Sequence, residues 1–259
     1  MAVLGRSVAQ VSARLAAAGC VAAAEEAAEL LDAAPDGPTL DAWLRRREGG
    51  EPLAWITGSM TFCDRILSVS PGVFVPRAQT EELARRAAAL LRAGGRALDL
   101  CTGAGAVAAH LGATVPSATV IGIDIDPGAV RCARRNGVAA VVGDLAAPIR
   151  QSASFDVVTA VAPYVPTAQL GFLPTDVQRH EPRRALDGGG EGLDLVRRIV
   201  PAAAQLLAPG GWLLLELGHE QDEALAPTLA AAGFDPAASW QDDEGDLRGI
   251  AARAGRPTT

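Results

Sequence analysis

The spacing of apolar residues predicts that the chain begins with helices. Over residues 5–48, apolar side chains recur every three or four positions, which places them on one face of successive helices. The residues Pro35–Pro38 interrupt this pattern and predict a turn. Thr39 is then expected to cap a short helix that Gly49-Gly50 ends. We therefore predict a small helical domain over residues 1–58, of the kind that holds a substrate or a partner.

A different pattern follows in residues 60–75. Here apolar residues alternate with polar ones, and Ser70-Pro71-Gly72 breaks the run, which indicates a β-hairpin. Thr80, followed by two glutamates, is expected to open the next helix. We expect the hairpin to form a linker over residues 59–78, ahead of a larger domain over residues 79–259.

From residue 97 onwards, short apolar runs alternate with helix-like segments. The apolar runs predict strands, and the periodic segments between them predict helices. Such alternation is typical of an α/β fold in which a doubly wound sheet carries helices on both faces. The expected strands are 97–100, 120–125, 138–142, 155–161 and 212–217, and the expected helices start at 107 and cover 127–136 and 225–232.

The ends of three neighbouring strands carry residues suited to binding an adenosyl group. Residues 99–105 read Asp-Leu-Cys-Thr-Gly-Ala-Gly, and glycines before a helix let a ligand approach free backbone N–H groups. Asp124 ends the second strand, where a carboxylate can accept hydrogen bonds from both ribose hydroxyls. Asp144 ends the third strand, where an adenine amino group would lie.

The glycine turn favours S-adenosylmethionine over a nicotinamide cofactor. A dinucleotide site usually needs the third glycine of GxGxxG, and Ala108 stands at that place, which argues against a dehydrogenase. The DxxTGxG form resembles class I S-adenosylmethionine-dependent methyltransferases instead. On this resemblance the cofactor is expected to contact Arg77, Thr80, Asp99, Cys101, Thr102, Gly103, Ala104, Gly105, Asp124, Ile125, Asp144, Leu145 and Val161.

Further blocks extend the resemblance over nearly the whole chain. Together they resemble the HemK-type methyltransferases, which modify a glutamine side chain in peptide-chain release factors. The resemblance implies a helical N-terminal domain, a β-hairpin linker and a Rossmann-like class I methyltransferase fold with a doubly wound, mostly parallel, seven-stranded sheet. The blocks are Glu51–Gly58, Val75–Glu81, Ala97–Ala109, Glu181–Arg198, Pro209–Gln221 and Asp243–Arg248.

The chain departs from the family at the fourth strand. The family motif is NPPY, in which the asparagine side chain and the next carbonyl accept hydrogen bonds from the substrate amide. Here Val161 offers no acceptor, whereas Ala162 keeps its carbonyl. A buried amide N–H left unpaired costs about 1–3 kcal/mol. We therefore expect the acceptor to be a small molecule, as in specialised metabolism.

Two other side chains near this motif have candidate roles. Tyr164, the chain's one tyrosine, can form a wall against the acceptor or orient it through its hydroxyl, or simply pack at a strand end. His180 can act as a general base, because imidazole titrates near neutrality, or be a solvated loop residue. The candidate catalytic residues are Val161, Ala162, Pro163, Tyr164 and His180.

Other functions stay open at this point. The valine can be a tolerated change in a release factor glutamine methyltransferase, so that the partner is a protein glutamine loop. The protein can also catalyse another displacement at the sulfonium group of S-adenosylmethionine, such as a ring closure. It can also bind S-adenosylmethionine without turnover.

Composition and charge exclude further classes of protein. The 259 residues are 49% apolar and 20% charged, which predicts a folded chain, and the net charge of −7 argues against nucleic-acid binding. The four cysteines form no Cys/His cluster, so we expect free thiols and no metal site. No apolar run reaches about 18 residues, so we expect no membrane span and a cytoplasmic protein.

Overall fold

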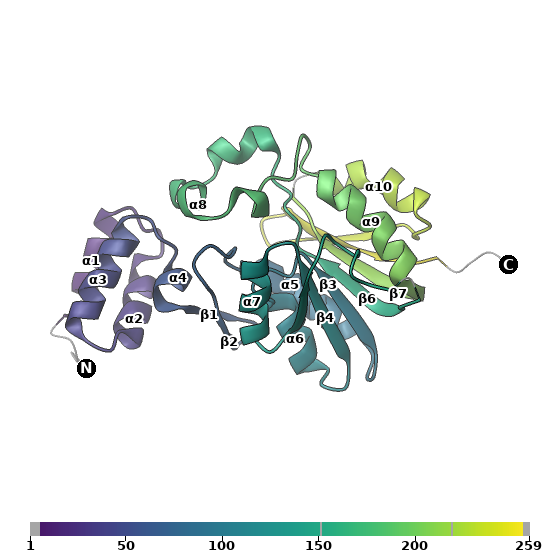
Figure 1. Cartoon of the computed structure of the whole chain (residues 1–259). Coiled ribbons are helices and arrows are strands. Elements are labelled where there is room, and N and C mark those ends of the chain that lie inside the picture. Colours follow the sequence, from purple (N-terminus) through teal and green to yellow (C-terminus); the bar gives the residue numbers. More distant parts are fainter. Residues whose placement is uncertain (1–5, 151, 219, 256–259) are drawn as a thin grey trace.

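The computed structural model describes residues 6–150, 152–218 and 220–255. The chain begins with four helices, so the start of the predicted helical stretch, at residue 5, lies outside the described residues. These helices lie at one end of the molecule and enclose their own hydrophobic cluster, with Leu15, Leu30, Leu40 and Leu44 fully buried (Figure 1). They are α1 (Val8–Ala17), α2 (Ala23–Ala33), α3 (Gly37–Glu48) and α4 (Leu53–Thr57).

The cap of α3 differs from the prediction. Asp36, not Thr39, is the N-cap residue, and its carboxylate accepts a hydrogen bond from the Thr39 backbone N–H at 2.7 Å. The helix begins earlier than expected because Pro38 fits the first turn, where its missing N–H has no intrahelical partner to lose.

The hairpin is present, but its turn lies earlier than predicted. Strands β1 (Ser59–Phe62) and β2 (Arg65–Ser68) pair antiparallel. The turn consists of Cys63 and Asp64, with φ of 47° and 58°, as a two-residue turn that follows the strand twist requires. Neither residue is a glycine, so the sequence carried a stronger turn signal at Ser70-Pro71-Gly72, which instead follows β2.

A seven-stranded sheet forms the body of the chain and confirms the predicted α/β class. The strand order is β5-β4-β3-β6-β7-β9-β8, in which the first five strands are parallel, β9 pairs antiparallel with β7, and β8 pairs antiparallel with β9. The order reverses between β3 and β6, so ligands are expected beyond the carboxyl ends there. The strands are β3 (Arg96–Leu100), β4 (Thr119–Asp124), β5 (Ala139–Val142), β6 (Phe155–Ala160), β7 (Leu207–Glu216), β8 (Ala238–Gln241) and β9 (Leu247–Arg253).

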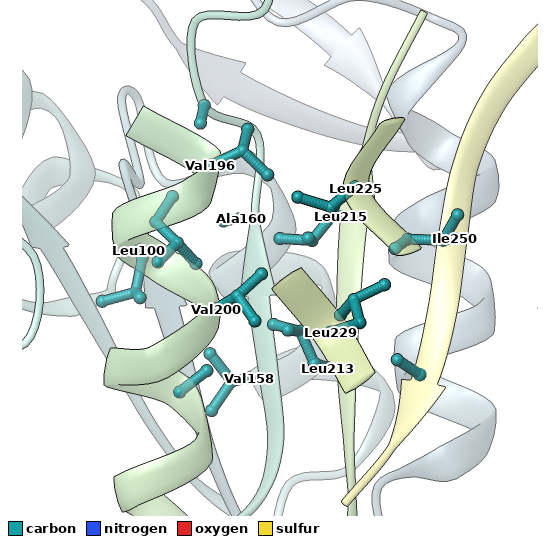
Figure 2. Packing of buried hydrophobic residues seen from close by; sticks show 14 of the residues in the cluster. Leu100, Val158, Ala160, Val196, Val200, Leu213, Leu215, Leu225, Leu229 and Ile250 are labelled. Atoms are coloured by element: carbon teal, nitrogen blue, oxygen red, sulfur yellow. The ribbon is translucent and has the colours of Figure 1, made fainter. Parts of the chain in front are cut away.

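Helices cover both faces of this sheet. On one face α9 and α10 bury Val196, Val200, Leu225 and Leu229 against β6, β7 and β9, and Figure 2 shows these side chains pointing toward the strands. Each such side chain stabilises the fold by roughly 1.5–3 kcal/mol when fully buried. Helices α5 and α6 pack on the opposite face. The helices are α5 (Thr80–Leu90), α6 (Ala106–Thr114), α7 (Pro127–Arg135), α8 (Thr175–His180), α9 (Asp194–Leu206) and α10 (Gln221–Ala231).

A single side chain joins the hairpin to the glycine turn. The Asn136 amide nitrogen donates to the carbonyl oxygens of Ser68, at 2.9 Å, and of Ala104, at 2.8 Å. Its amide oxygen accepts from the Ser68 backbone N–H at 2.8 Å. The hairpin is therefore fixed beside the turn that the sequence predicts to bind the cofactor.

Within the described residues, none of the helices combines the length and the apolar character that crossing a bilayer requires. All four cysteines are free.

Candidate active site

The carboxyl ends of the parallel strands open into a cavity of about 160 Å³. Segments far apart in sequence meet there, because the strand order brings the ends of β3, β4, β5 and β6 to one edge of the sheet. The predicted site residues that line this first cavity are Cys101, Asp124, Ile125, Asp144, Leu145, Val161 and Pro163.

The turn after β3 needs glycine at one position above all. Gly105 has a φ of 82°, and a Cβ atom there would lie 2.9 Å from both the Ala133 Cβ and the Val138 Cγ2 atoms. Gly103 is also left-handed, with a φ of 55°, but a Cβ atom there would meet nothing within 4 Å. Close packing against α7 therefore explains Gly105, whereas Gly103 leaves open space on the turn.

Cys101 stands in the same turn and is also left-handed. Its φ is 56°, a conformation that costs a non-glycine residue roughly 1–2 kcal/mol. Burial raises the pKa of the Cys101 thiol, and so do the neighbouring carboxylates of Asp124 and Asp99. The thiol is therefore protonated and lines the cavity as a small side chain rather than as a nucleophile.

The Asp124 carboxylate is held by backbone donors at the end of β4. One oxygen accepts from the Gly103 N–H at 2.8 Å, and the other accepts from the Asp126 N–H at 2.9 Å. Burial raises the pKa of Asp124, and these two backbone hydrogen bonds oppose that rise. Each oxygen keeps a lone pair for a further donor. A rigid carboxylate between the apolar side chains of Ile125 and Leu145 fits the ribose hydroxyls and the flat base of an adenosyl group.

Asp99 lies beneath the cavity rather than in its wall. Its carboxylate is 2% exposed and accepts from the hydroxyls of Thr102, at 2.5 Å, and Thr159, at 2.7 Å. Burial raises the pKa of Asp99 to about 6, although both hydroxyls lower it. Asp99 therefore joins β3, the glycine turn and β6. Thr102 and Ala104 are buried in the same turn.

Two arginines border the first cavity. Arg198 on α9 pairs with Asp144 at 2.7 Å, and Arg184 pairs with Asp126 at 2.5 Å. All four side chains remain partly exposed, so these ion pairs contribute little to stability. Both arginines and Leu195 lie in the block Glu181–Arg198 that carries the family resemblance, but none was predicted as a site residue, because they follow the strand ends at a long distance in sequence.

A second cavity, of about 330 Å³, adjoins the first. The two share Phe74, Val161 and Ala185, so Val161 lies where a cofactor site and an acceptor site would meet. Phe74 was also missed, although it directly precedes the block that begins at Val75. The other lining residues are mostly apolar, with Ala162, Val165, Leu173, Val177 and Leu186 among them.

Arg77 lines this second cavity and not the first. Its guanidinium pairs with Glu181 at 2.5 Å and lies 4.7 Å from the centre of the Phe74 ring. Arg77, which the family resemblance led us to expect at the cofactor, is thus paired with a carboxylate at the second cavity. Burial raises the pKa of Glu181, and the charge of Arg77 opposes that rise.

Polar side chains at the start of α5 hold Tyr164 in place. The Gln79 amide nitrogen donates to the Tyr164 hydroxyl oxygen at 2.8 Å and to Glu216 Oε1 at 3.1 Å. The Thr80 hydroxyl donates to Glu216 Oε2 at 2.6 Å, so Thr80 is engaged away from both cavities. Burial and the charge of Glu216 raise the pKa of Tyr164. The Tyr164 ring therefore forms a wall of the second cavity while its hydroxyl is already bonded.

His180 is not brought to either cavity. It ends α8, where its Nε2 atom lies 3.3 Å from the Gly49 carbonyl oxygen and its ring meets the Trp55 ring edge-on at 6.5 Å. Among the described residues, those that line the second cavity include no aspartate, glutamate or histidine. This described part of the wall therefore offers no carboxylate or imidazole that could take a proton from an acceptor.

Comparisons with known proteins agree with this geometry. A family model described as a methyltransferase domain matches residues 97–179. The chain is 38% identical over 218 residues to a release factor glutamine methyltransferase of Geobacter sulfurreducens, covering 82% of this chain and 76% of the relative. It is 39% identical over 213 residues to a 4-amino-L-phenylalanine/4-methylamino-L-phenylalanine methyltransferase of Streptomyces pristinaespiralis, covering 78% of this chain and 73% of the relative.

Solved structures show the same fold at low sequence identity. A methyltransferase from Pyrococcus furiosus has a TM-score of 0.52 at 17% identity, with 73% of this chain and 88% of that chain covered. A T. thermophilus 16S rRNA methyltransferase in complex with AdoMet and guanosine has a TM-score of 0.52 at 21% identity, with 76% and 49% covered. The chain belongs to the HemK-type family of S-adenosylmethionine-dependent methyltransferases, within which the release factor glutamine methyltransferases are its relatives.

Proposed function

We propose that this enzyme transfers a methyl group from S-adenosylmethionine to the nitrogen of a small aromatic amine. The observation that carries the proposal is Val161, which separates the two cavities without offering a hydrogen-bond acceptor. A glutamine amide needs such an acceptor to hold its nitrogen toward the methyl group. An amine nitrogen has its own lone pair and depends less on that help.

The second cavity also favours an acceptor that is already neutral. Because the described residues of its lining include no aspartate, glutamate or histidine, a protonated alkylamine would find no base among them. An aromatic amine is unprotonated at neutral pH and can react directly. The relative from Streptomyces pristinaespiralis is named for an amino-substituted phenylalanine and its methylamino form, which supports this class of acceptor.

The roles of the residues follow from their places. Asp124 would hold the ribose hydroxyls, and Ile125 and Leu145 would flank the base. Bound S-adenosylmethionine supplies a methyl group on a positively charged sulfur. The acceptor nitrogen forms a bond to the methyl carbon as the carbon–sulfur bond breaks, which leaves S-adenosylhomocysteine, and the methylated nitrogen then gives one proton to solvent. Phe74, Tyr164 and Val161 would position the acceptor and exclude water.

Methylation of a release factor glutamine is the second candidate. Several relatives of the chain, the one from Geobacter sulfurreducens among them, carry that name, and Ala162 retains the backbone carbonyl that would serve as one of two acceptors. The missing second acceptor at position 161 argues against it.

An assay with 4-amino-L-phenylalanine tests the proposal. Wild-type enzyme and S-adenosylmethionine are expected to give a product carrying the methyl group on the ring amine, located by tandem mass spectrometry. Asp124→Ala serves as the control for cofactor-dependent turnover. An enzyme that binds S-adenosylmethionine yet leaves the amine unmodified, while methylating a release-factor peptide, would contradict the proposal.

A further inference from the structure

Position 161 lies beside the polar residues at the start of α5. The pairing of β6 with β7 ends with Ala160 opposite Leu215, so Val161 and Glu216 follow next to each other at the sheet edge. Val161 packs against the hydrophobic cluster that α5 forms with the sheet, and Glu216 is bonded to Gln79 and Thr80 of the same helix start. Both side chains therefore face the α5 side of the sheet.

The amide of Gln79 is oriented by its partners. Its nitrogen donates both to the Tyr164 hydroxyl oxygen and to the Glu216 carboxylate. Glu216 accepts from this nitrogen through Oε1 and from the Thr80 hydroxyl through Oε2, so the amide nitrogen is on that side and the amide oxygen on the other. Within the described part of the chain, no group donates a hydrogen bond to Gln79 Oε1. Gln79 lines the second cavity together with Val161 and Ala162.

We propose that Gln79 Oε1 accepts a hydrogen bond from the amine nitrogen of the acceptor, from the start of α5 and not from the end of β6, where the asparagine of the family motif would stand. This inference rests on the proposed function and deepens it. A primary amine carries two N–H groups, which Gln79 Oε1 and the Ala162 carbonyl oxygen bind together, so that the lone pair faces the methyl group. The site therefore favours a primary over a secondary amine, because a secondary amine fills only one of the two acceptors.

Four proteins separate this role from a merely structural one. They are wild type, Gln79→Met, the double variant Gln79→Met/Val161→Asn, and Glu82→Gln, which removes a surface ion pair with Arg86 on the same helix and lies away from the cavity. Each is assayed for kcat/KM with 4-amino-L-phenylalanine and for S-adenosylmethionine affinity by calorimetry.

Gln79→Met is expected to lower kcat/KM about 10- to 100-fold, because one N–H of the bound amine is left unpaired. Val161→Asn is expected to restore much of that loss, since it returns an amide oxygen to the same cavity. The kcat/KM of Glu82→Gln, and the affinity of all four proteins for S-adenosylmethionine, are expected to stay within about threefold of wild type.

A Gln79→Met enzyme as active as wild type, a loss that Val161→Asn fails to restore, or an equal loss in Glu82→Gln would overturn the role of Gln79. A wild-type enzyme that binds S-adenosylmethionine but does not methylate the amine would overturn the proposed function instead, and the role of Gln79 with it. Assaying the wild-type enzyme first therefore distinguishes a failure of the proposed function from a failure of the role of Gln79.

Discussion

The Asp124 carboxylate accepts a hydrogen bond from the Gly103 backbone N–H at 2.8 Å and so joins the end of β4 to the glycine turn after β3. This bond fixes a carboxylate that keeps lone pairs for ligand hydroxyls at the point where the sheet order reverses. Cofactor binding in this account depends on that arrangement.

Asp124→Ala is therefore expected to weaken S-adenosylmethionine binding about 10- to 100-fold, the loss expected when charged hydrogen bonds are removed. Isothermal titration calorimetry measures the change. Glu223→Ala, on an exposed site of α10, removes the same charge away from the cavity and should bind like wild type. Equal affinity in Asp124→Ala and wild type would refute this role of the carboxylate.

The two glycines of the turn offer a matched comparison of stability. Gly103→Ala should cost roughly 1–2 kcal/mol, because the residue is left-handed but has free space around it. Gly105→Ala adds contacts of 2.9 Å with Ala133 and Val138, and overpacking adds roughly 1–3 kcal/mol. Chemical denaturation without cofactor measures both, and a Gly105→Ala protein no less stable than Gly103→Ala would contradict the packing argument.

The raised pKa of Asp99 predicts that the stability of the protein depends on pH. Its pKa in the folded protein is raised to about 6 by burial, above its ordinary value of 3.8, so the folded state retains a proton that the unfolded state loses. The resulting stabilisation is present at acidic pH and is lost as the pH rises through about 6. Lowering the pH from 7 to 5 should raise the free energy of unfolding of wild type by about 1 kcal/mol relative to Asp99→Asn. Parallel pH profiles for the two proteins would show that Asp99 does not titrate in this way.

Replacing Val161 with asparagine is expected to change which acceptor the enzyme methylates. Val161→Asn returns an amide oxygen to the boundary between the two cavities, where the glutamine-modifying relatives are expected to hold the substrate amide. Methylation of a release-factor glutamine peptide should rise by about tenfold or more, since one unpaired N–H costs about 1–3 kcal/mol. Val161→Leu, which adds volume without an acceptor, is the control. No gain with Val161→Asn would show that the valine does not determine the acceptor.

Much of the site could be predicted because local sequence determines it. Asp124 and Asp144 follow apolar runs, and parallel strands bring their carboxyl ends together. The glycine turn is also local, since Gly105 is required by its own φ and by a helix that follows soon after in the chain.

The remainder depends on contacts distant in sequence. Arg77 and Thr80 belong to a recognisable block, yet their side chains are bonded to Glu181 and Glu216, more than 100 residues later, rather than to the first cavity. His180 lies beside Gly49 of the N-terminal helices for the same reason. The hairpin turn at Cys63 and Asp64 was not predicted, because the pair lacks the glycine that usually marks a left-handed turn.

Competition between acceptors tests the central claim most directly. Wild-type enzyme is given limiting S-adenosylmethionine with equal concentrations of 4-amino-L-phenylalanine and a glutamine-containing release-factor peptide, and both products are quantified by mass spectrometry. The account predicts that the amine receives the methyl group in at least about tenfold excess over the peptide. Methylation of the peptide in preference to the amine would contradict it.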